Sequence, residues 1–198
     1  MRVTGGHAKG ITIRAPKGRH VRPTSDKVRE ALFNTLGVDV ADTRVLDLFS
    51  GSGALGIEAL SRGAEHVTFV ENDPVALRAI AENLARVGLA EKGEIVRSDF
   101  RSALRTLGKR KKKFHLILAD PPYQGNLLEK MADAIAQHSV TLRGTIIVIE
   151  HFKKTEPPPA ISDIPLVETR TYGQTALSYF RRAGGLPSHK SHAGSAPS

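Results

Sequence analysis

The sequence contains no cysteine and no long apolar run, and each absence excludes a class of protein. Without cysteine, none of the 198 residues can form a disulfide bond or a thiolate metal site. No apolar run approaches the roughly 18 residues that a membrane span needs. The stretch MRVTGGHAKG at the start contains no hydrophobic signal region. We therefore expect a cytoplasmic protein that binds neither a membrane nor a metal ion.

Acidic residues are scarce, above all near the N-terminus. The chain carries 29 Lys and Arg against 20 Asp and Glu, a formal net charge of +9. Up to residue 29 a single acid, Asp26, stands against eight basic residues: Arg2, Lys9, Arg14, Lys17, Arg19, Arg22, Lys27 and Arg29. This excess favours a polyanionic partner, most simply nucleic acid, over the alternative of a solubilising surface. The candidate RNA-binding residues are Arg14, Lys17, Arg19, Arg22 and Arg29.

The length suits one α/β domain with a hydrophobic core, flanked by two shorter segments. Residues 1–23 are interrupted by glycine and proline, and Ile11 and Ile13 alternate as in a half-exposed strand. That pattern predicts a basic N-terminal β-hairpin extension. Residues 24–183 are expected to form the main domain. Residues 184–198, rich in Gly, Ser, Pro, His and Ala, are expected to be a disordered tail.

Strand-like and helix-like segments alternate from residue 44 onward. Helices are expected at 24–36, 54–62, 74–87, 101–107 and 127–137, and strands at 45–49, 66–71, 94–98, 114–119, 145–150, 166–172 and 176–181. Such alternation builds a parallel sheet with helices on both faces. The last two strands flank Gly173 and predict an antiparallel hairpin, after a linker at 153–165.

Residues 44–56, RVLDLFSGSGALG, are typical of a buried strand, a glycine turn and the start of a helix. Gly51, Gly53 and Gly56 match the pattern GxGxxG, whose glycines let a ligand approach the exposed helix N–H groups. A plain strand-to-helix turn would give the same pattern. Asp47 is more informative, because a carboxylate here disfavours the pyrophosphate of NAD or FAD and attracts a cation. S-adenosylmethionine, with an ammonium and a sulfonium but no phosphate, suits this turn.

Polar residues also follow the next two strands. Glu71 lies 20 positions beyond Gly51, where an acid can bind the two ribose hydroxyls of adenosine. Asp99 can accept from the adenine amino group, although a helix N-cap explains it about as well, and N-capping is the alternative for Asn72. The candidate cofactor-binding residues are Asp47, Gly51, Gly53, Glu71, Asn72 and Asp99.

The motif Asp120-Pro121-Pro122-Tyr123 ends the strand expected at 114–119. Two prolines cannot continue a strand ladder, so they force a rigid extended turn with free carbonyl groups. An exocyclic amino group of a base is a poor nucleophile, and hydrogen bonds to the Asp120 carboxylate and the Pro121 carbonyl would favour its attack on a methyl group. Tyr123 would stack on the base. A merely stiff loop is the alternative to this catalytic interpretation.

With these motifs, the sequence resembles the RsmD family of small-subunit (16S) ribosomal RNA guanine-N2 methyltransferases over about residues 1–182. The resemblance rests on KG at 9–10, RPTSDKVREALFN at 22–34, LDLFSGSGALGIEALSRGA at 46–64, VEND at 70–73, LADPPY at 118–123 and YGQTALSYF at 172–180. It implies a class I methyltransferase fold with a seven-stranded, mostly parallel sheet and one antiparallel strand in the last hairpin. It also implies that S-adenosylmethionine binds Asp47, Gly51, Gly53 and Glu71, and that the guanine is handled by Asp120, Pro121 and Tyr123.

The resemblance implies ribosomal RNA, or an assembling small ribosomal subunit, as the partner, and we expect a monomer. Three other functions stay open. A methyltransferase acting on DNA adenine or protein glutamine shares the central motifs. An NAD-linked dehydrogenase fits GxGxxG but leaves Asp47 and residues 120–123 unexplained. A non-catalytic RNA-binding assembly factor fits the charge. The run KRKKK at 109–113 is outside the family pattern, and we interpret it as a solvated loop slightly in preference to an RNA contact.

Overall fold

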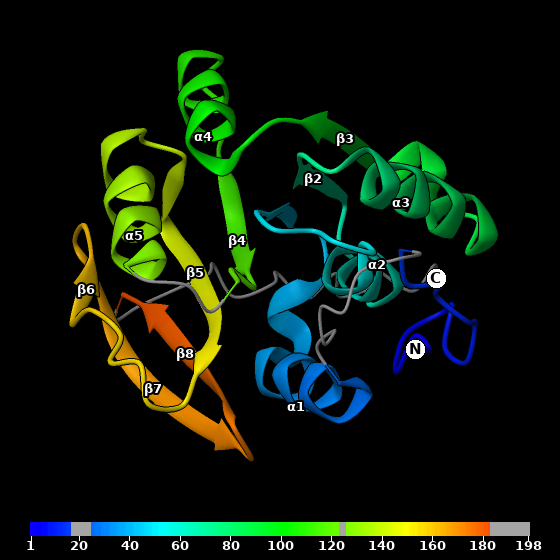
Figure 1. The fold of residues 1–198 in the computed structure, drawn as a ribbon, viewed down its shortest axis with the longest axis horizontal. Coiled ribbons are helices and arrows are strands. Elements are labelled where there is room, and N and C mark those ends of the chain that lie inside the picture. Colours follow the sequence, from blue (N-terminus) through cyan, green and yellow to red (C-terminus); the bar gives the residue numbers. More distant parts are fainter. Residues whose placement is uncertain (17–24, 123–125, 183–198) are drawn as a thin grey trace, which may run out of the picture.

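The computed structural model describes residues 1–16, 25–122 and 126–182, so Lys17, Arg19, Arg22, Tyr123 and the expected tail lie outside the described residues. One eight-stranded sheet has the order β3-β2-β1-β4-β5-β8-β7-β6 (Figure 1). Neighbouring strands from β1 to β5 pair in parallel, whereas β8 is antiparallel to β5 and to β7. The strands are β1 (Arg44–Asp47), β2 (His66–Glu71), β3 (Gly93–Arg97), β4 (Phe114–Ala119), β5 (Thr141–Phe152), β6 (Ala160–Ile161), β7 (Ile164–Tyr172) and β8 (Thr175–Arg181).

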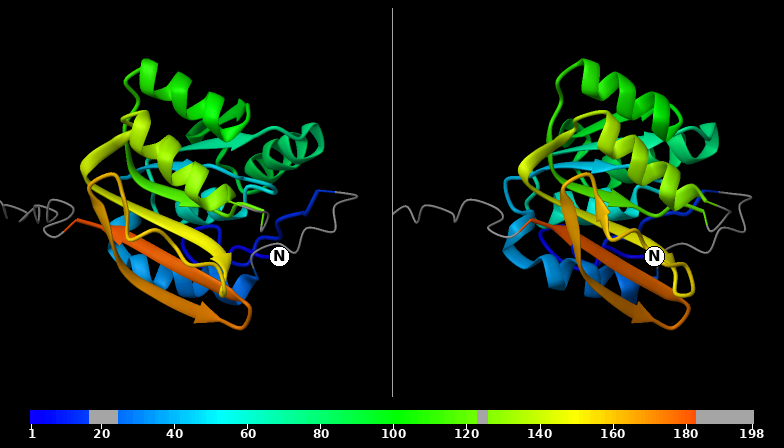
Figure 2. Two further views of the ribbon diagram at one scale, coloured as in Figure 1. Left: turned by 60° about the vertical axis from the view of Figure 1, so that its left-hand side comes forward. Right: turned by 90° about the vertical axis from the view of Figure 1, so that its left-hand side faces the viewer.

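Helices cover both faces of this sheet, which confirms the expected α/β class. Two hydrophobic clusters divide the helices: one joins the sheet to α1, α2 and α3, and the other joins it to α4 and α5. Figure 2 shows α1 on the opposite side of the sheet from α4 and α5. The helices are α1 (Asp26–Leu36), α2 (Ala54–Ser61), α3 (Pro74–Arg86), α4 (Phe100–Lys109) and α5 (Leu127–Gln137), with short 3-10 helices η1 (Gly37–Val40) and η2 (Ala90–Lys92).

The sheet has one strand more than the seven expected. The extra strand, β6, lies in the segment expected to be only a linker, and it pairs antiparallel with the start of β7. Ser162 adopts a φ of 56° in the turn between them. Ile161 and Ile164 are both buried beside α5. Apolar burial on either side of a tight turn therefore extends the sheet by one short strand.

Local signals place the helix ends close to the predicted positions. Ser25 caps α1, because its hydroxyl accepts from the Val28 N–H at 3.2 Å, and Gly37, with a φ of 55°, ends it. Asp73 caps α3 by accepting from the Val75 N–H at 2.9 Å, and a proline occupies its first turn. All three helix ends follow from short-range chemistry that the sequence displays.

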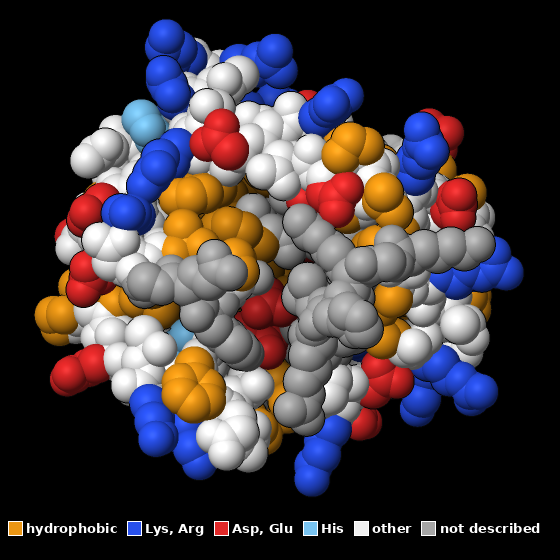
Figure 3. Space-filling model, in the orientation of Figure 1, with side chains coloured by type: hydrophobic (Ala, Val, Ile, Leu, Met, Phe, Trp, Pro, Cys, Tyr) orange, Lys and Arg blue, Asp and Glu red, His pale blue; other side chains and the backbone are white. Residues whose placement is uncertain are grey.

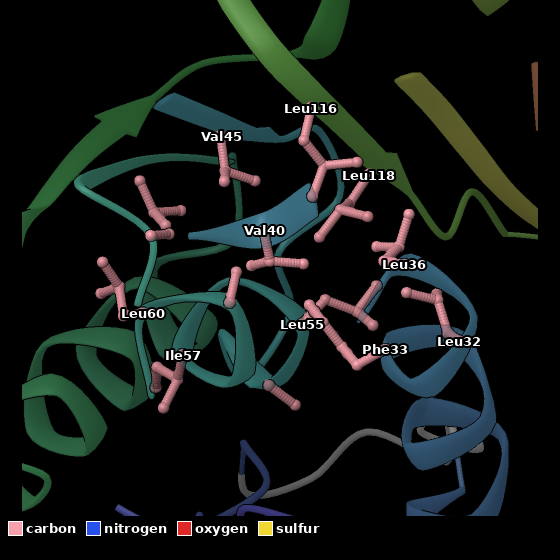
Figure 4. Close-up of a cluster of buried hydrophobic side chains, with 14 of the residues drawn as sticks. Leu32, Phe33, Leu36, Val40, Val45, Leu55, Ile57, Leu60, Leu116 and Leu118 are labelled. Carbon is pink, nitrogen blue, oxygen red and sulfur yellow. The ribbon is translucent and has the colours of Figure 1, made fainter. Parts of the chain in front are cut away.

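The helix α2 is buried along its whole length, between β1 and α1. Figure 4 shows the side chains around it, drawn from α1, η1, α2, β1 and β4. Fully buried members include Phe33, Val40, Val45, Ile57 and Leu60. Because the glycine turn leads directly into α2, this packing fixes the direction in which the N-terminus of α2 points.

The N-terminal segment differs from the expected β-hairpin extension. Between residues 1 and 16 the only β pairing is the isolated antiparallel bridge Arg2↔Thr12. Backbone hydrogen bonds flank this bridge, from the Val3 N–H to the Ile11 carbonyl and from the Ile13 N–H to the Met1 carbonyl, both at 3.0 Å. The segment also bonds to α2: the Ala8 N–H donates to the Ser61 hydroxyl at 3.0 Å. Gly6 has a φ of 74°, and a Cβ there would lie 1.7 Å from the Ser61 carbonyl oxygen. The expected hairpin is therefore short and irregular and lies against α2. Val3, Ala8 and Ile13 join the core.

A buried carboxylate holds this segment to α1 and α2. Glu58 of α2 accepts from the Thr4 N–H at 2.8 Å, the Arg29 Nε at 3.2 Å and the Arg62 Nε at 2.9 Å. The Arg29 guanidinium also donates to the carbonyl of Arg2 and to Asp26. Arg29 is 0% exposed. Its predicted role in RNA binding is therefore wrong: its cationic head neutralises a buried acid and cannot reach a phosphate.

Replacing Glu58 by Ala should destabilise the protein by about 3–5 kcal/mol, because it leaves the Arg29 charge buried without its carboxylate. Urea denaturation measures the change in the free energy of unfolding. Glu168→Ala is the matched control, since Glu168 pairs with Arg170 at 2.6 Å but both side chains are over 40% exposed. That control should lose less than about 1 kcal/mol. Equal losses in the two variants would contradict the structural role of Glu58.

Candidate cofactor and substrate site

The carboxyl ends of three adjacent strands bring the predicted acids together. In the register of the sheet, Asp47 of β1 is opposite Phe69 of β2 and Leu118 of β4. Glu71 ends β2, and Asp120 follows β4 directly. Figure 3 shows acidic side chains at the centre of the face on which β4 ends. Ligands of open α/β sheets bind at this edge.

Asp47 is fully buried at the end of β1. Its Oδ2 accepts from the Gly56 N–H at 3.1 Å. In the described part of the chain, its Oδ1 makes no hydrogen bond that meets geometric criteria. Burial, reinforced by the negative charge of Glu71, raises the pKa of Asp47 to about 7, although N–H and hydroxyl groups of Gly56, Phe49 and Ser50 oppose the rise. A buried carboxylate with an unused oxygen is suited to a cationic ligand.

The three glycines of the turn have different physical roles. Gly51 has a φ of 53°, and a Cβ built there meets no atom within 4 Å, so the backbone borders open space. Gly53 has a φ of 78° and precedes α2 as its N-cap. At Gly56 a Cβ would lie 2.3 Å from the Phe69 ring, so this glycine permits close packing of α2 on β2. Gly51 thus borders open space, Gly53 provides the left-handed turn into α2, and Gly56 permits close packing. Cofactor contact by Gly51 and Gly53 stays a prediction.

Glu71 organises the turn as well as facing it. Its Oε2 accepts from the Gly51 N–H at 2.9 Å, and its Oε1 accepts from the Asn72 and Asp73 N–H groups at 2.8 and 3.0 Å. A carboxylate offers about four acceptor positions. At least one therefore stays for a ribose hydroxyl, so ribose binding by Glu71 stays a prediction. The exposed side chain of Asn72 lies beside it.

Asp99 follows the alternative interpretation, a helix N-cap. Its Oδ1 accepts from the N–H groups of Arg101 and Ser102 at 3.0 and 3.1 Å, at the start of α4. Hydrogen bonds from Ser102 lower its pKa, so it carries a full negative charge at neutral pH. Capping accounts for the carboxylate without a ligand. Contact with adenine stays a prediction.

The first two residues of the motif at 120–123 lie at the carboxyl end of β4. Asp120 is half-buried and Pro121 is buried, immediately beyond β4. The pairing of Leu48 with Leu118, at 3.0 Å between N and O, brings them beside the start of the glycine turn. Asp120, Pro121 and the glycine turn thus share one edge of the sheet, and the role of Asp120 and Pro121 as acceptors of an amino group stays a prediction.

Sequence reasoning missed a polar chain at the end of β5. His151 is buried, and its Nε2 lies 2.8 Å from the Ser178 hydroxyl, which lies 2.8 Å from the Thr169 hydroxyl. Burial lowers the pKa of His151, which keeps its ring neutral at pH 7. A cavity of about 610 Å³ adjoins it, lined also by Lys153 and Lys154. The sequence signal for this polar chain is Ser178, a hydroxyl within the otherwise apolar end of YGQTALSYF, the stretch on which the family resemblance rests.

Another missed residue connects the N-terminal segment to the glycine turn. Asn83 of α3 is fully buried. It accepts from the Arg14 N–H at 2.9 Å and donates to the carbonyls of Arg14 and Ser52, both at 2.9 Å. This bridge holds the exposed residue Arg14 near the cofactor turn. Its RNA contact stays a prediction, as do those of Lys17, Arg19 and Arg22.

This combination of fold and site defines the class I S-adenosylmethionine-dependent methyltransferases. The orphaned oxygen of Asp47, the open space at Gly51 and the remaining acceptor of Glu71 all fit that cofactor. Solved structures of this fold at lower identity include S-adenosylmethionine-dependent methyltransferases that hold the cofactor or its demethylated product, a likeness that shows the fold alone.

Within this class the chain belongs to the family described as conserved hypothetical protein 95, the RsmD family, whose model matches residues 1–181. It is 38% identical over 184 residues to YlbH of Bacillus subtilis, which bears the provisional name of an rRNA methyltransferase, covering 93% of this chain and 100% of that protein. It is 31% identical to ribosomal RNA small subunit methyltransferase D of Escherichia coli, covering 92% and 90%. A solved E. coli structure titled as methyltransferase YhhF matches with a TM-score of 0.79 and 32% identity, covering 92% and 97%.

No helix in residues 1–16, 25–122 and 126–182 is long and apolar enough to cross a membrane. No group of three or more His, Cys, Asp or Glu side chains in those residues could hold a metal ion.

Cofactor affinity should depend on pH through Asp47. With a pKa of about 7 before binding, Asp47 is protonated in acid, and a bound cation favours its ionised form. Binding therefore releases a proton below pH 7, and affinity should rise up to about tenfold per pH unit between pH 5.5 and 7, then level off. Calorimetry with S-adenosylmethionine measures this.

Asp47→Asn is the control for this prediction, because it keeps the shape of the side chain and cannot ionise. It should bind S-adenosylmethionine more weakly and with no such rise between pH 5.5 and 7. An equally steep rise in the variant would show that another group titrates.

Proposed function

We propose that this protein transfers a methyl group from S-adenosylmethionine to the exocyclic N2 amino group of a guanine in 16S ribosomal RNA. The observation that carries the proposal is the position of Asp120 and Pro121 directly beyond β4, on the strand next to the β1 end that bears Asp47. Membership of a family that includes E. coli small subunit methyltransferase D supports the substrate.

The cofactor supplies an electrophilic methyl group on a sulfonium, and the chain has to position and polarise the nucleophile. The amino lone pair of guanine is delocalised into the ring. Acceptance of its two N–H hydrogens by the Asp120 carboxylate and the Pro121 carbonyl holds the nitrogen toward the glycine turn. The negative charge of Asp120 favours the positive charge that develops on the attacking nitrogen. Pro121 and Pro122 stiffen the backbone, so the acceptors are oriented before the substrate arrives.

The charge of the protein supports a nucleic-acid substrate. The net charge of +9 favours association with phosphate, and Arg14 is exposed close to the turn through its bridge to Asn83. We propose Arg14, Lys17, Arg19 and Arg22 as phosphate contacts near the target base, and we leave Arg29 out because it is buried. Tyr123 is proposed to stack on the flipped guanine.

The alternatives differ in what they leave unexplained. A dehydrogenase has no use for Asp120 and Pro121 and needs a pyrophosphate beside Asp47. A non-catalytic assembly factor has no use for a methyl-donor site. Methylation of DNA adenine or protein glutamine shares the site. Mass mapping of modified guanines in ribosomal RNA from a deletion strain, with and without the gene restored, tests the substrate: a full set of modified guanines in the deletion strain would contradict the proposal.

Asp120→Asn should slow single-turnover methyl transfer by on the order of 10²–10³-fold, because it removes a charge-assisted hydrogen bond that matters mainly in the transition state. Binding of S-adenosylmethionine and the melting temperature should stay near wild type. Tyr123→Ala should weaken RNA binding as well, by about 1–3 kcal/mol of stacking. If residues 120–123 are only a stiff turn, both variants should lose thermal stability and cofactor affinity together. A folded Asp120→Asn enzyme that keeps its rate would contradict the catalytic role.

A further inference from the structure

The groove between α4 and α5 is a strongly basic surface outside the methyl-transfer site. It has a volume of about 430 Å³ and is lined on one side by Arg101 and Arg105 of α4 and on the other by Lys130, Asp133 and the end of α5. Its cationic side chains are exposed. Where α4 lies in Figure 1, Figure 3 shows Lys and Arg side chains gathered along the edge of the molecule.

The basic surface continues beyond the groove at the end of α4. Arg101, Arg105 and Lys109 are spaced four residues apart, which places them on one side of the helix. The run Lys109–Lys113 follows without an intervening acid, and its first four side chains are exposed. Charges at a helix C-terminus complement the helix dipole, but one or two cations satisfy that effect. The remaining positive charge is available to an external anion.

Backbone geometry at the run points the same way. The N–H groups of Lys111 and Lys112 bond to the carbonyls of Gly108 and Leu107 at 2.9 and 3.0 Å, which is the bonding of a Schellman motif. Lys111 occupies the left-handed position with a φ of 56°. Glycine is the usual residue there because a side chain is strained in this conformation. At this position lysine costs backbone strain that glycine would avoid, which fits a functional requirement for the charge of Lys111.

The groove has a closely packed wall, so the helices that bear its charges are fixed relative to each other before a ligand binds. A Cβ at Gly108 would lie 2.2 Å from the His138 carbonyl oxygen, which shows how closely the ends of α4 and α5 approach. Lys113 bonds to the Ser139 hydroxyl at 2.9 Å, joining the loops that follow the two helices. The Lys113 ammonium is therefore occupied by this contact between the two loops. The side chains of Arg101, Arg105, Lys109 and Lys111 are exposed to solvent.

We propose that the α4–α5 groove and the adjoining run bind the phosphate backbone of the RNA substrate, at a second contact remote from the N-terminal basic segment. This proposal rests on the proposed function. α4 begins beside Asp99, at the carboxyl ends of the strands, and ends at their amino ends, where β4 begins. The basic surface along α4 therefore leads from the side of the methyl-transfer site around the α4–α5 side of the molecule. The guanidinium groups suit bidentate phosphate binding. Basic ribosomal proteins would be repelled by the same charge, which favours RNA as the occupant.

The test compares Arg105→Glu/Lys109→Glu with Arg86→Glu/Lys92→Glu. The control also reverses the charge of one arginine and one lysine, at exposed positions at the end of α3 and in η2, away from the α4–α5 groove. Binding of a 16S ribosomal RNA fragment is measured by fluorescence anisotropy over a range of salt concentrations. The groove variant should bind on the order of 10- to 100-fold more weakly at 0.1 M salt, with a salt slope smaller by roughly 1.4–1.8. Its S-adenosylmethionine affinity and its single-turnover rate at saturating RNA should match the wild type.

Lys111→Gly separates function from stability. Glycine relieves the backbone strain, so the melting temperature should stay equal or rise by up to about 4 °C, while RNA binding weakens. A lysine kept only for structure would give the wild-type RNA affinity in this variant.

The outcomes separate the two proposals. A wild-type protein that neither binds nor methylates ribosomal RNA would overturn both the proposed function and the groove. A groove variant that binds RNA as the Arg86→Glu/Lys92→Glu control does would overturn the groove alone. A groove variant that keeps its affinity for naked RNA and loses it only for protein-bearing small subunits would assign the groove to a protein partner and overturn the RNA proposal.

Discussion

The buried carboxylate of Glu58 is the interaction on which the arrangement of the site depends. It joins α2 to α1 through Arg29 and to the N-terminal segment through Thr4. α2 starts at the glycine turn, so whatever fixes α2 also fixes the N–H groups that face the cofactor. The same segment then runs to Asn83, which holds it to the carbonyl of Ser52 within the turn. One acid in the core thus connects the part expected to meet RNA with the part that binds the methyl donor.

The elements that the sequence predicted well are those with a local cause. β2, β4 and α5 were predicted with the observed bounds, because apolar runs and turn residues delimit them. The acids at the ends of β1, β2 and β4 were found for the same reason: the positions follow from where each strand stops. Features of the fold that depend on tertiary packing were predicted less well from the sequence. The early start of β5 at Thr141 depends on its pairing with Phe114 of β4. The pairing of β6 with β7 is local, but it is stabilised by burial of Ile161 and Ile164 beside α5, which lies earlier in the chain.

Arg29 shows where reading by residue type fails. Among eight basic residues near the N-terminus it has the same signature as its neighbours, and only the partner Glu58, 29 positions away, makes it a core residue. The N-terminal segment departs from a regular hairpin for a related reason. Part of its backbone pairs with itself, but the Thr4 and Ala8 N–H groups and the Gly5 carbonyl bond to the side chains of Glu58 and Ser61. Partners of buried polar groups are decided by tertiary contacts that a one-dimensional pattern does not contain.

Charge is divided on this molecule in a way that serves two ligands of opposite sign. The acids Asp47, Glu71 and Asp120 are buried or half-buried at the strand ends, whereas the cations of α4 and of the N-terminal segment are exposed. Burial strengthens the field of the acids at short range, where a small cation binds. Exposed cations act over about 8 Å in physiological salt, which suits the long phosphate chain of an RNA. The acids would repel phosphate from the methyl-transfer site, whereas an uncharged base would not be repelled. If the exposed cations bind the RNA backbone as proposed, they would hold it away from those acids, and extrusion of a single base would satisfy both sets of charges.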